Sequence, residues 1–382
     1  MKTPTIRNQC TGCFACVIAC PKQCIQISSG KLLHLYPRIE EDKCIECNFC
    51  RKICPNNINF DFNAPTNTYA CWANDKREYL SSASGGIGSV LSRLIINRGG
   101  VVYGCSCESG IDIRHIRVDS LSNIDKLKGS KYVQSDIRGC YQAIKTDVFC
   151  NRLVLFIGTP CQIAAIKSFL GKEYENLLLV DIICHGVPSR DLLYTHIKGI
   201  TNLSDCDKIK FREGNDFTMT VENDCHLVYK TNLWKERYKD FYYNAFMDGY
   251  TYRDSCYECK YAGPKRISDI TIGDFWGLGH DVEYDKKNGI SCVLVNTHKG
   301  MLYFDQIRDS IHCVERTLQE AINGNDQLRG PKLKTFRIRI FRVLHNWVGN
   351  KNAYSLLEFD HLLAKNYMPK FKSFIKRIIR VY

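Results

Sequence analysis

The sequence lacks any run of 18 apolar residues, which is about the length that a helix needs to cross a membrane. No apolar stretch precedes the first cysteine, Cys10, so we expect no secretory signal peptide. The G-x-G-x-x-G turn of dinucleotide-binding folds and the G-x-x-x-x-G-K-[ST] phosphate-binding loop are both missing. We therefore expect that the protein does not use NAD(P) through the first motif or a nucleoside triphosphate through the second.

Cysteine, by contrast, is abundant, with 22 residues among 382. Two stretches share the spacing C-x2-C-x2-C-x3-C-P, and the second repeats the first 34 residues further along the chain. Runs of this kind bind 4Fe–4S clusters, and the fourth cysteine of each run serves the other cluster. We therefore expect the first cluster on Cys10, Cys13, Cys16 and Cys54, and the second on Cys44, Cys47, Cys50 and Cys20.

Zinc binding and disulfide bonds are the alternative uses of these cysteines. Zinc sites have longer gaps between pairs of ligands, and disulfides need an oxidising compartment, so the spacing favours clusters in a reducing cytoplasm. Cys24 has no counterpart in the second run, where Ile58 stands, and we predict that it is a plain buried thiol. Apolar residues after each run predict the short strands that close a ferredoxin-like unit: Ile25, Ile27, Ile58 and Phe60.

The length and the 45% of hydrophobic residues allow two or three domains. Residues 1–62 are expected to form a dicluster ferredoxin domain. Apolar runs at 153–157 and 177–183, each followed by a helical pattern, predict an α/β domain with parallel strands over residues 63–330. Residues 208–230 are predicted to form a β-hairpin insertion, and residues 331–382 a basic helical tail. The expected fold class is an α+β ferredoxin unit followed by an α/β domain.

Four further cysteines have positions typical of ligands. Cys161 and Cys184 each follow a predicted parallel strand, at the sheet edge where α/β folds bind ligands. Cys256 and Cys259 form a C-x2-C pair. Together the four thiols could hold a third 4Fe–4S cluster. Alternatively, the first two are packed thiols and the pair binds zinc.

A chain of clusters moves single electrons, whereas a substrate that takes a hydride needs a converter, which is usually a flavin. The turn Ser84-Gly85-Gly86 stands before a helical pattern, so its backbone N–H groups could hold a flavin phosphate. Glycine turns before helices are common, so the turn by itself is equally consistent with a structural role.

Several motifs, in this order along residues 66–315, resemble the coenzyme F420 hydrogenase/dehydrogenase beta-subunit family. They are GTPCQIAA at 158–165, DIICHGVPS at 181–189, DITIGDFWG at 269–277 and GISCVLVN at 289–296, and the turn at 84–86 resembles the amino-terminal motif of the family. The resemblance implies FAD and a third 4Fe–4S cluster, held by the four further cysteines, in one domain. It also implies an organic substrate, either the deazaflavin coenzyme F420 or another conjugated molecule. Bacterial members with such a ferredoxin domain often belong to surface-polysaccharide pathways.

The strand ends and the resemblance indicate further candidate site residues, most of them with a structural alternative. His185 could protonate a reduced substrate or hydrogen-bond its own turn. Asp274 could bond the flavin or the substrate, or cap a loop. Trp276 could cover the isoalloxazine ring or belong to the core. Lys131 is a candidate for an FAD phosphate, and Thr159, within the first motif, for a cofactor contact.

The net charge of +13 is unevenly distributed, because residues 331–382 carry twelve Lys and Arg against two carboxylates, a net +10. Apolar residues at helical spacing accompany this charge: Phe371, Phe374, Ile375, Ile378 and Ile379. The combination predicts peripheral binding to an anionic membrane surface, and a solvated charged face is the alternative. No nucleic-acid motif occurs, so nucleic-acid binding is not expected.

These features predict a cytoplasmic iron–sulfur flavoprotein oxidoreductase. Electrons would pass from a redox partner or a ferredoxin through the clusters to FAD, and then to a small organic substrate. The alternatives are a coenzyme F420-dependent enzyme, an electron-transfer subunit that docks to a larger complex, and a zinc-stabilised interaction protein.

Overall fold

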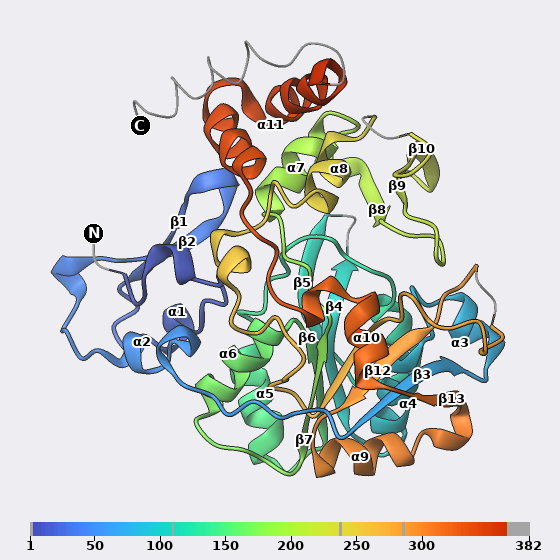
Figure 1. Cartoon of the computed structure of the whole chain (residues 1–382). Coiled ribbons are helices and arrows are strands. Elements are labelled where there is room, and N and C mark those ends of the chain that lie inside the picture. Colours follow the sequence, from blue (N-terminus) through green and yellow to red (C-terminus); the bar gives the residue numbers. More distant parts are fainter. Residues whose placement is uncertain (1–2, 109–110, 237–238, 285–286, 365–382) are drawn as a thin grey trace.

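The computed structural model describes residues 3–108, 111–236, 239–284 and 287–364. Figure 1 shows a small N-terminal unit (residues 3–62, blue) beside a large mixed sheet, with a smaller sheet and a kinked C-terminal helix (red) above it. The mixed α and β architecture with a small N-terminal unit confirms the predicted fold class. Within these ranges no helix is both long and apolar enough to span a bilayer.

The N-terminal unit contains two short helices and one hairpin. The helices α1 (Ala15–Ala19) and α2 (Phe49–Lys52) each begin two residues after the second cysteine of a run. Strand β1 (Ile25–Ser29) pairs antiparallel with β2 (Leu35–Ile39), so that Ile25 lies opposite Ile39.

The prediction of a strand at residues 58–60 is wrong. The chain makes a short 3-10 turn at Pro55–Asn57 and then runs on to the large sheet, where Phe60 packs against the core of the main body. The partner of β1 is instead β2, the next segment along the chain, because closing a short loop costs less entropy than closing a long one.

The large sheet has a parallel centre and antiparallel flanks. Its strands are β3 (Asn67–Ala73), β4 (Val101–Glu108), β5 (Asp112–Val118), β6 (Val154–Gly158), β7 (Leu177–Ile182), β11 (Ile270–Asp274), β12 (Ser291–Val295) and β13 (Ile311–Arg316). Their order is β13-β3-β12-β11-β7-β6-β4-β5. The pairs β4–β6, β6–β7 and β7–β11 are parallel. The two parallel strands expected from the apolar runs are therefore β6 and β7, at the centre of the sheet.

Helices cover both faces of the large sheet (Figure 1). Alternate residues of each central strand point to opposite faces, and so they supply two separate cores. One core contains α4 (Ile87–Asn97) and α9 (His298–Asp305), and the other contains α5 (Cys140–Phe149) and α6 (Pro160–Leu170). The shorter helices α3 (Lys76–Leu80) and α10 (Leu318–Gly324) lie against β3.

A third core joins the insertion to three more helices. The insertion has three antiparallel strands, β8 (Cys206–Lys210), β9 (Thr218–Asn223) and β10 (His226–Asn232), where a two-stranded hairpin was expected. The expected turn joins β8 to β9. A second turn at Asp224 and Cys225, both with positive φ, joins β9 to β10.

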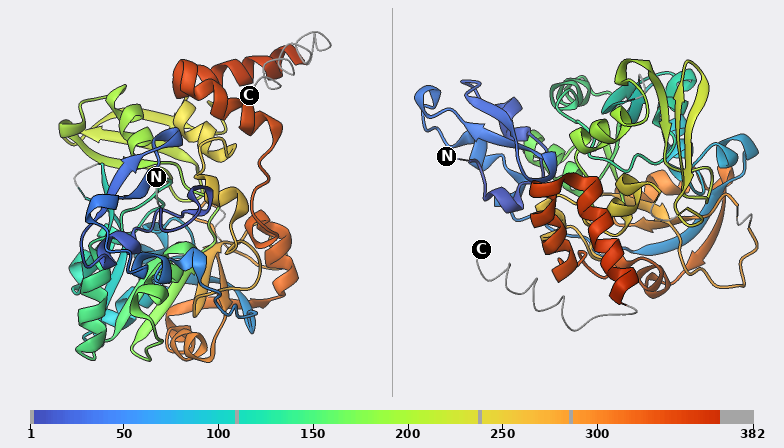
Figure 2. Two further views of the ribbon diagram at one scale, coloured as in Figure 1. Left: turned by 90° about the vertical axis from the view of Figure 1, so that its left-hand side faces the viewer. Right: turned by 90° about the horizontal axis from the view of Figure 1, so that it is seen from above.

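The helices of this third core are α7 (Arg190–Lys198), α8 (Phe241–Met247) and α11 (Phe336–Ala364). Figure 2 shows α11 (red) as two helical segments, which a non-helical Gly349 separates. It contacts α8 and the 3-10 turn Lys31–Leu33 of the N-terminal unit. Phe341, Tyr354 and Leu357 of α11 are buried, so this part of the predicted tail belongs to the folded body. The apolar residues predicted at 371–379 lie outside the described residues.

Candidate functional site

A cavity of about 680 Å³ lies at the carboxyl ends of the parallel strands β6, β7 and β11. Its walls include Gly158, Ile182 and Asp274 from those strand ends, the turn before α4, and the loop between β8 and β9. This edge is where open α/β sheets bind ligands, and the volume is within the range of about 300–1,000 Å³ typical of ligand sites. We call it the larger cavity.

The turn before α4 presents hydrogen-bond donors to the larger cavity. Gly86 has a φ of 83° and precedes the helix without a capping side chain, so the first N–H groups of α4 are available to an anion. The Ser84 hydroxyl is buried and has no hydrogen-bond partner within the described part of the chain. Gly85 has a different role, because a Cβ there would lie 2.1 Å from the carbonyl oxygen of Cys71. The predicted turn therefore combines a packing glycine with donors for a phosphate.

Glu78 anchors this turn from beneath. Its buried carboxylate accepts hydrogen bonds from Ser89 and Arg93 and pairs with Lys128 at 3.1 Å. Burial alone would raise the pKa of Glu78, but the bonds from Arg93, Ser89 and Lys128 outweigh it and lower the pKa to about 2. Ser82, two residues before the turn, donates to the main-chain carbonyl oxygen of Glu78. The carboxylate thus ties α3, α4 and the loop before Lys131 together.

Lys131 lines the larger cavity, but its ammonium group is already bonded. It donates to the carbonyl oxygens of Leu127 and Lys128 at 3.2 and 2.7 Å and to that of Cys105 at 2.9 Å. Burial lowers the pKa of Lys131. In this structure the side chain holds its own loop in place.

The insertion supplies a buried arginine that the sequence did not indicate as a site residue. The Arg212 guanidinium donates to Asp274 at 2.6 Å and lies 4.7 Å above the ring of Phe217. The Phe217 ring stacks on that of Trp276, with centroids 6.1 Å apart. Asp274 and Trp276, both expected at the site, therefore line the larger cavity together with Arg212. The only sequence signal of Arg212 was its place in a predicted turn.

A polar network at the floor of the larger cavity was also not predicted. His115 donates from Nε2 to the Ile157 carbonyl oxygen at 2.9 Å, so its Nδ1 accepts from the Ser135 hydroxyl at 3.1 Å. Ser135 in turn accepts from Gln162, whose Oε1 accepts from the backbone N–H of Thr159. Burial is the main reason that the pKa of His115 falls to about 4, so the ring is neutral and its orientation is defined.

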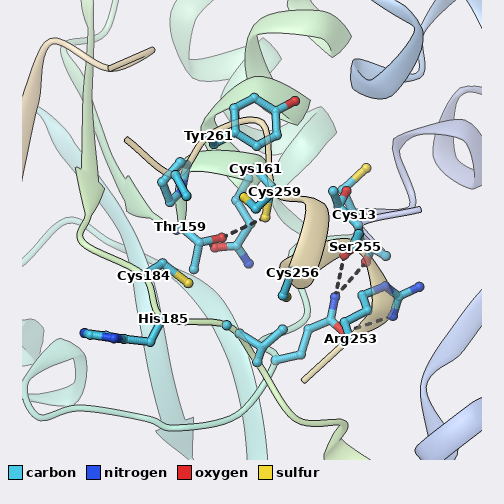
Figure 3. A pocket seen from close by; sticks show the side chains of 18 of the residues that line it. Cys13, Thr159, Cys161, Cys184, His185, Arg253, Ser255, Cys256, Cys259 and Tyr261 are labelled. Carbon is cyan, nitrogen blue, oxygen red and sulfur yellow. Dashed lines mark hydrogen bonds between the residues drawn. The ribbon is translucent and has the colours of Figure 1, made fainter. Parts of the chain in front are cut away.

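A smaller cavity, of about 60 Å³, is lined by the four further cysteines (Figure 3). Cys161 lies in the first turn of α6, Cys184 follows β7, and Cys256 and Cys259 come from the 3-10 turn after Arg253. The Thr159 hydroxyl lies 3.2 Å from the Cys161 sulfur. The four residues are therefore brought together as the sequence predicted.

The thiols of the smaller cavity affect one another electrostatically. Burial raises the pKa of Cys161 well above its ordinary value, and the nearby Cys184 and Cys259 raise it further. Burial likewise raises the pKa of Cys184 and of Cys256 to about 12. Four sulfurs around one zinc ion would lie about 3.8 Å apart. Nowhere in the described ranges do three or more His, Cys, Asp or Glu side chains come close enough to hold a single ion.

The cysteines of the N-terminal unit lie close enough to affect one another. Burial is the largest cause that raises the pKa of Cys16, and Cys13, Cys10 and Cys54 of its expected group, followed by Cys50 of the other, raise it further. After burial, Cys20, Cys44 and Cys47 raise the pKa of Cys50. Cys24, expected to be a plain thiol, is buried but lies 3.4 Å from the sulfur of Cys20.

The two sets of N-terminal cysteines and the two cavities lie one after another in space. Cys13 of the first group lines the smaller cavity, and Figure 3 shows it on the side of that cavity opposite His185. Thr159, Cys184 and His185 line both cavities. His185 also pairs with Asp326, with 3.2 Å between Nδ1 and Oδ1. The order is thus the second group, the first group, the smaller cavity and the larger cavity.

Comparisons with known proteins match two regions of the chain. Residues 9–58 match the model of the 4Fe-4S dicluster domain. Residues 151–320 match the model of the C-terminal region of the coenzyme F420 hydrogenase/dehydrogenase beta subunit. A chain from the F420-reducing [NiFe] hydrogenase complex of Methanosarcina barkeri is 15% identical, with a TM-score of 0.48 over 71% of this chain and 93% of that chain. No curated protein matched the sequence.

The fold and the matched domains define an iron–sulfur electron-transfer protein of the oxidoreductase type. Residues 151–320 are thus similar to the C-terminal region of the coenzyme F420 hydrogenase/dehydrogenase beta subunit, and a match to a 4Fe–4S dicluster domain precedes that part.

Proposed function

We propose that the protein is an iron–sulfur flavoprotein oxidoreductase. It takes electrons from a ferredoxin or another redox protein into the two clusters of its N-terminal unit. Cys161, Cys184, Cys256 and Cys259 would hold a third 4Fe–4S cluster, and the larger cavity would hold FAD, so that the electrons could reach an organic substrate. The observation that supports this best is the continuity of the sites, because Thr159, Cys184 and His185 line both cavities.

The larger cavity fits a flavin nucleotide in size and in its donors. The Ser84 hydroxyl and the first N–H groups of α4 would hold a phosphate, which the positive end of the helix dipole also favours. Phe217 and Trp276 offer apolar contact to a planar ring system. When bound, a flavin supplies the conversion between one-electron and two-electron steps.

The side chains of the protein would handle the proton and orient the substrate. Since Nδ1 of His185 is bonded to Asp326, Nε2 is the nitrogen left to exchange a proton with the substrate. The Asp274 carboxylate is oriented by Arg212 and would accept hydrogen bonds from the substrate or the flavin. Following the family resemblance, we expect a conjugated organic substrate, with a place in surface-polysaccharide biosynthesis as the working hypothesis and coenzyme F420 as the alternative substrate.

The proposal is tested by the metal and flavin content of protein purified without oxygen. Three 4Fe–4S clusters correspond to about twelve iron atoms per chain, and denaturation should release one FAD. Cys259→Ser should lose about four iron atoms and keep the signals of the other two clusters. The matched control is Cys150→Ser, because Cys150 is exposed and lines neither cavity, and it should keep all the iron. About eight iron atoms in the unmodified protein would rule out the third cluster, and no FAD after reconstitution would rule out the flavoenzyme.

An electron-transfer subunit without a substrate of its own is the second candidate. The face around Cys47 favours it, because Cys47 is exposed and the neighbouring Ile45 and Phe49 are 59% and 44% exposed. That face would bring a partner protein close to the second cluster. Oxidation or reduction of a soluble substrate by the isolated chain would separate the two candidates in favour of the enzyme.

A further inference from the structure

Arg253 is a buried cation between two of the cysteine groups. Its side chain is among the largest that are fully buried, with 1% of the residue exposed. It stands three positions before Cys256 and lines the smaller cavity. From there it reaches the N-terminal unit, where Nε donates to the Cys10 carbonyl oxygen at 2.6 Å and Nη2 lies 3.6 Å from the Cys10 sulfur. Its guanidinium is therefore next to both the first cluster site and the proposed third one.

The positive charge of Arg253 has no carboxylate partner in the part of the chain that the structure describes. Its remaining donors meet the Leu35 carbonyl oxygen at 2.6 Å and Gln134 Oε1 at 3.2 Å, and it lies 4.3 Å above the ring of Tyr36. Two other buried arginines differ in this respect. Arg266, which also lines the smaller cavity, pairs with Asp181 at 3.0 Å, and Arg342 pairs with Asp254 at 2.8 Å.

The loop between the first two cluster cysteines is shaped to admit this arginine. Gly12 has a φ of 69°, and a Cβ there would lie 2.7 Å from the Arg253 guanidinium and from Gln134 Nε2. Gln134 Nε2 donates to the carbonyl oxygen of Thr11 at 2.9 Å. Burying a charge without a counter-charge costs free energy. The buried Arg253 guanidinium therefore needs a negative group nearby, which the two clusters would supply.

We propose that Arg253 sets the direction of electron transfer: its positive charge raises the reduction potentials of the first and third clusters relative to that of the second. The inference rests on the proposed function, since it requires clusters at both sites. Four thiolates give each cluster a net negative charge that grows by one on reduction, so a nearby cation stabilises the reduced form. At an effective dielectric constant of about 20, a unit charge closer than about 12 Å to a cluster changes the electron affinity of that cluster tenfold or more. Electron flow inward from the second cluster is thereby favoured.

The test is a potentiometric titration of the full-length holoprotein followed by EPR. Signals are assigned with Cys47→Ser for the second cluster and Cys259→Ser for the third. Arg253→Gln should lower the electron affinity of the first cluster at least tenfold, which is 59 mV for one electron, lower that of the third cluster as well, and leave the second nearly unchanged. Arg253→Lys keeps the charge and should recover most of the loss. Arg316→Gln, at an arginine of β13 that is paired with Asp281 and Glu320, should have no effect.

A second variant separates charge from packing. Gln134→Glu places a carboxylate beside Arg253 without removing the guanidinium, and it should also lower the potentials of the first and third clusters. Equal shifts in Arg253→Gln and Arg253→Lys, or unchanged potentials in Arg253→Gln with full iron, would overturn the proposal. If Arg253→Gln does not assemble its clusters, an unchanged potential in Gln134→Glu overturns it. The iron content of the unmodified protein tests the clusters themselves, so failure of the proposed function is seen separately.

Discussion

Replacing Glu78 by Gln tests how the protein holds the turn that we assign to a flavin phosphate. The side chain of Glu78 is 7% exposed, and its carboxylate is bound by Arg93, Ser89 and Lys128, which lower its pKa to about 2. In an unfolded chain a glutamate has a pKa of about 4.3. The difference of about 2.3 units corresponds to ~3 kcal/mol of stability. The Glu78→Gln variant should lose most of this stability, because a neutral amide cannot balance the charges of Arg93 and Lys128.

The pH dependence of this effect has a defined sign. A carboxyl whose folded pKa is depressed contributes its full stability above the unfolded pKa, and the contribution disappears as the pH falls toward the folded pKa. Between pH 6 and 9 the destabilisation by Glu78→Gln should therefore be constant. The fall in the thermal unfolding midpoint should be on the order of 5 °C for a chain of this size, measured without oxygen on cluster-loaded protein. Flavin retention should fall with it, since Ser89, in the first turn of α4, loses its carboxylate partner.

Glu173→Gln is the matched control. Glu173 pairs with Lys167 at 2.9 Å, but its side chain is 81% exposed. Exposed ion pairs contribute only about 0–1 kcal/mol, so this midpoint should move by about 1 °C or less. Equal effects of the two substitutions, or a Glu78→Gln effect that grows between pH 6 and 9, would refute the reasoning.

Three further predictions concern the turn, the neighbouring lysine and the carboxyl end. Gly86→Ala should lower both the unfolding midpoint and the FAD content, because a Cβ at a φ of 83° costs on the order of 1 kcal/mol and would lie 3.2 Å from the Ser82 hydroxyl. Lys131→Met should destabilise the protein by about 1–3 kcal/mol, because three carbonyl oxygens lose their donor. A lower affinity for FAD with an unchanged thermal unfolding midpoint would instead indicate that Lys131 contacts a phosphate of FAD. A chain ending at Ala364 keeps α11 but lacks six Lys and Arg. At low salt it should co-sediment with anionic vesicles more weakly than the full chain, since each basic residue near such a surface contributes about 1 kcal/mol. Equal binding of the two chains would exclude the proposed membrane attachment.

The sequence by itself determined the features that depend on short spacings. Three cysteines separated by gaps of two residues can wrap one cluster whatever the rest of the chain does, and the fourth serves the other cluster. The spacing alone therefore predicts the eight ligands and their exchange between the runs. The strands β6 and β7 could also be predicted, because burial on both faces requires continuous apolar residues. The Thr159–Cys161 turn follows directly from the end of β6. Cys161 and Cys184 could be placed at one sheet edge because parallel strands end together, whereas Cys256 and Cys259 were linked to them only by their C-x2-C spacing and the family resemblance.

The tertiary structure alone decided which distant residues meet at these sites. Arg253 reaches Cys10 across 243 positions, Arg212 reaches Asp274 across 62, and no local pattern distinguishes these arginines from others in the chain. The same holds for His115 and Ser135, whose bond depends on how β5 sits beside the loop before α5. The pairing of β1 with β2, and the burial of α11 in a segment with a strongly basic composition, followed from competition between several possible partners. Such contacts are settled by the docking of whole elements, because a side chain that bonds across the fold carries no signature in its own neighbourhood.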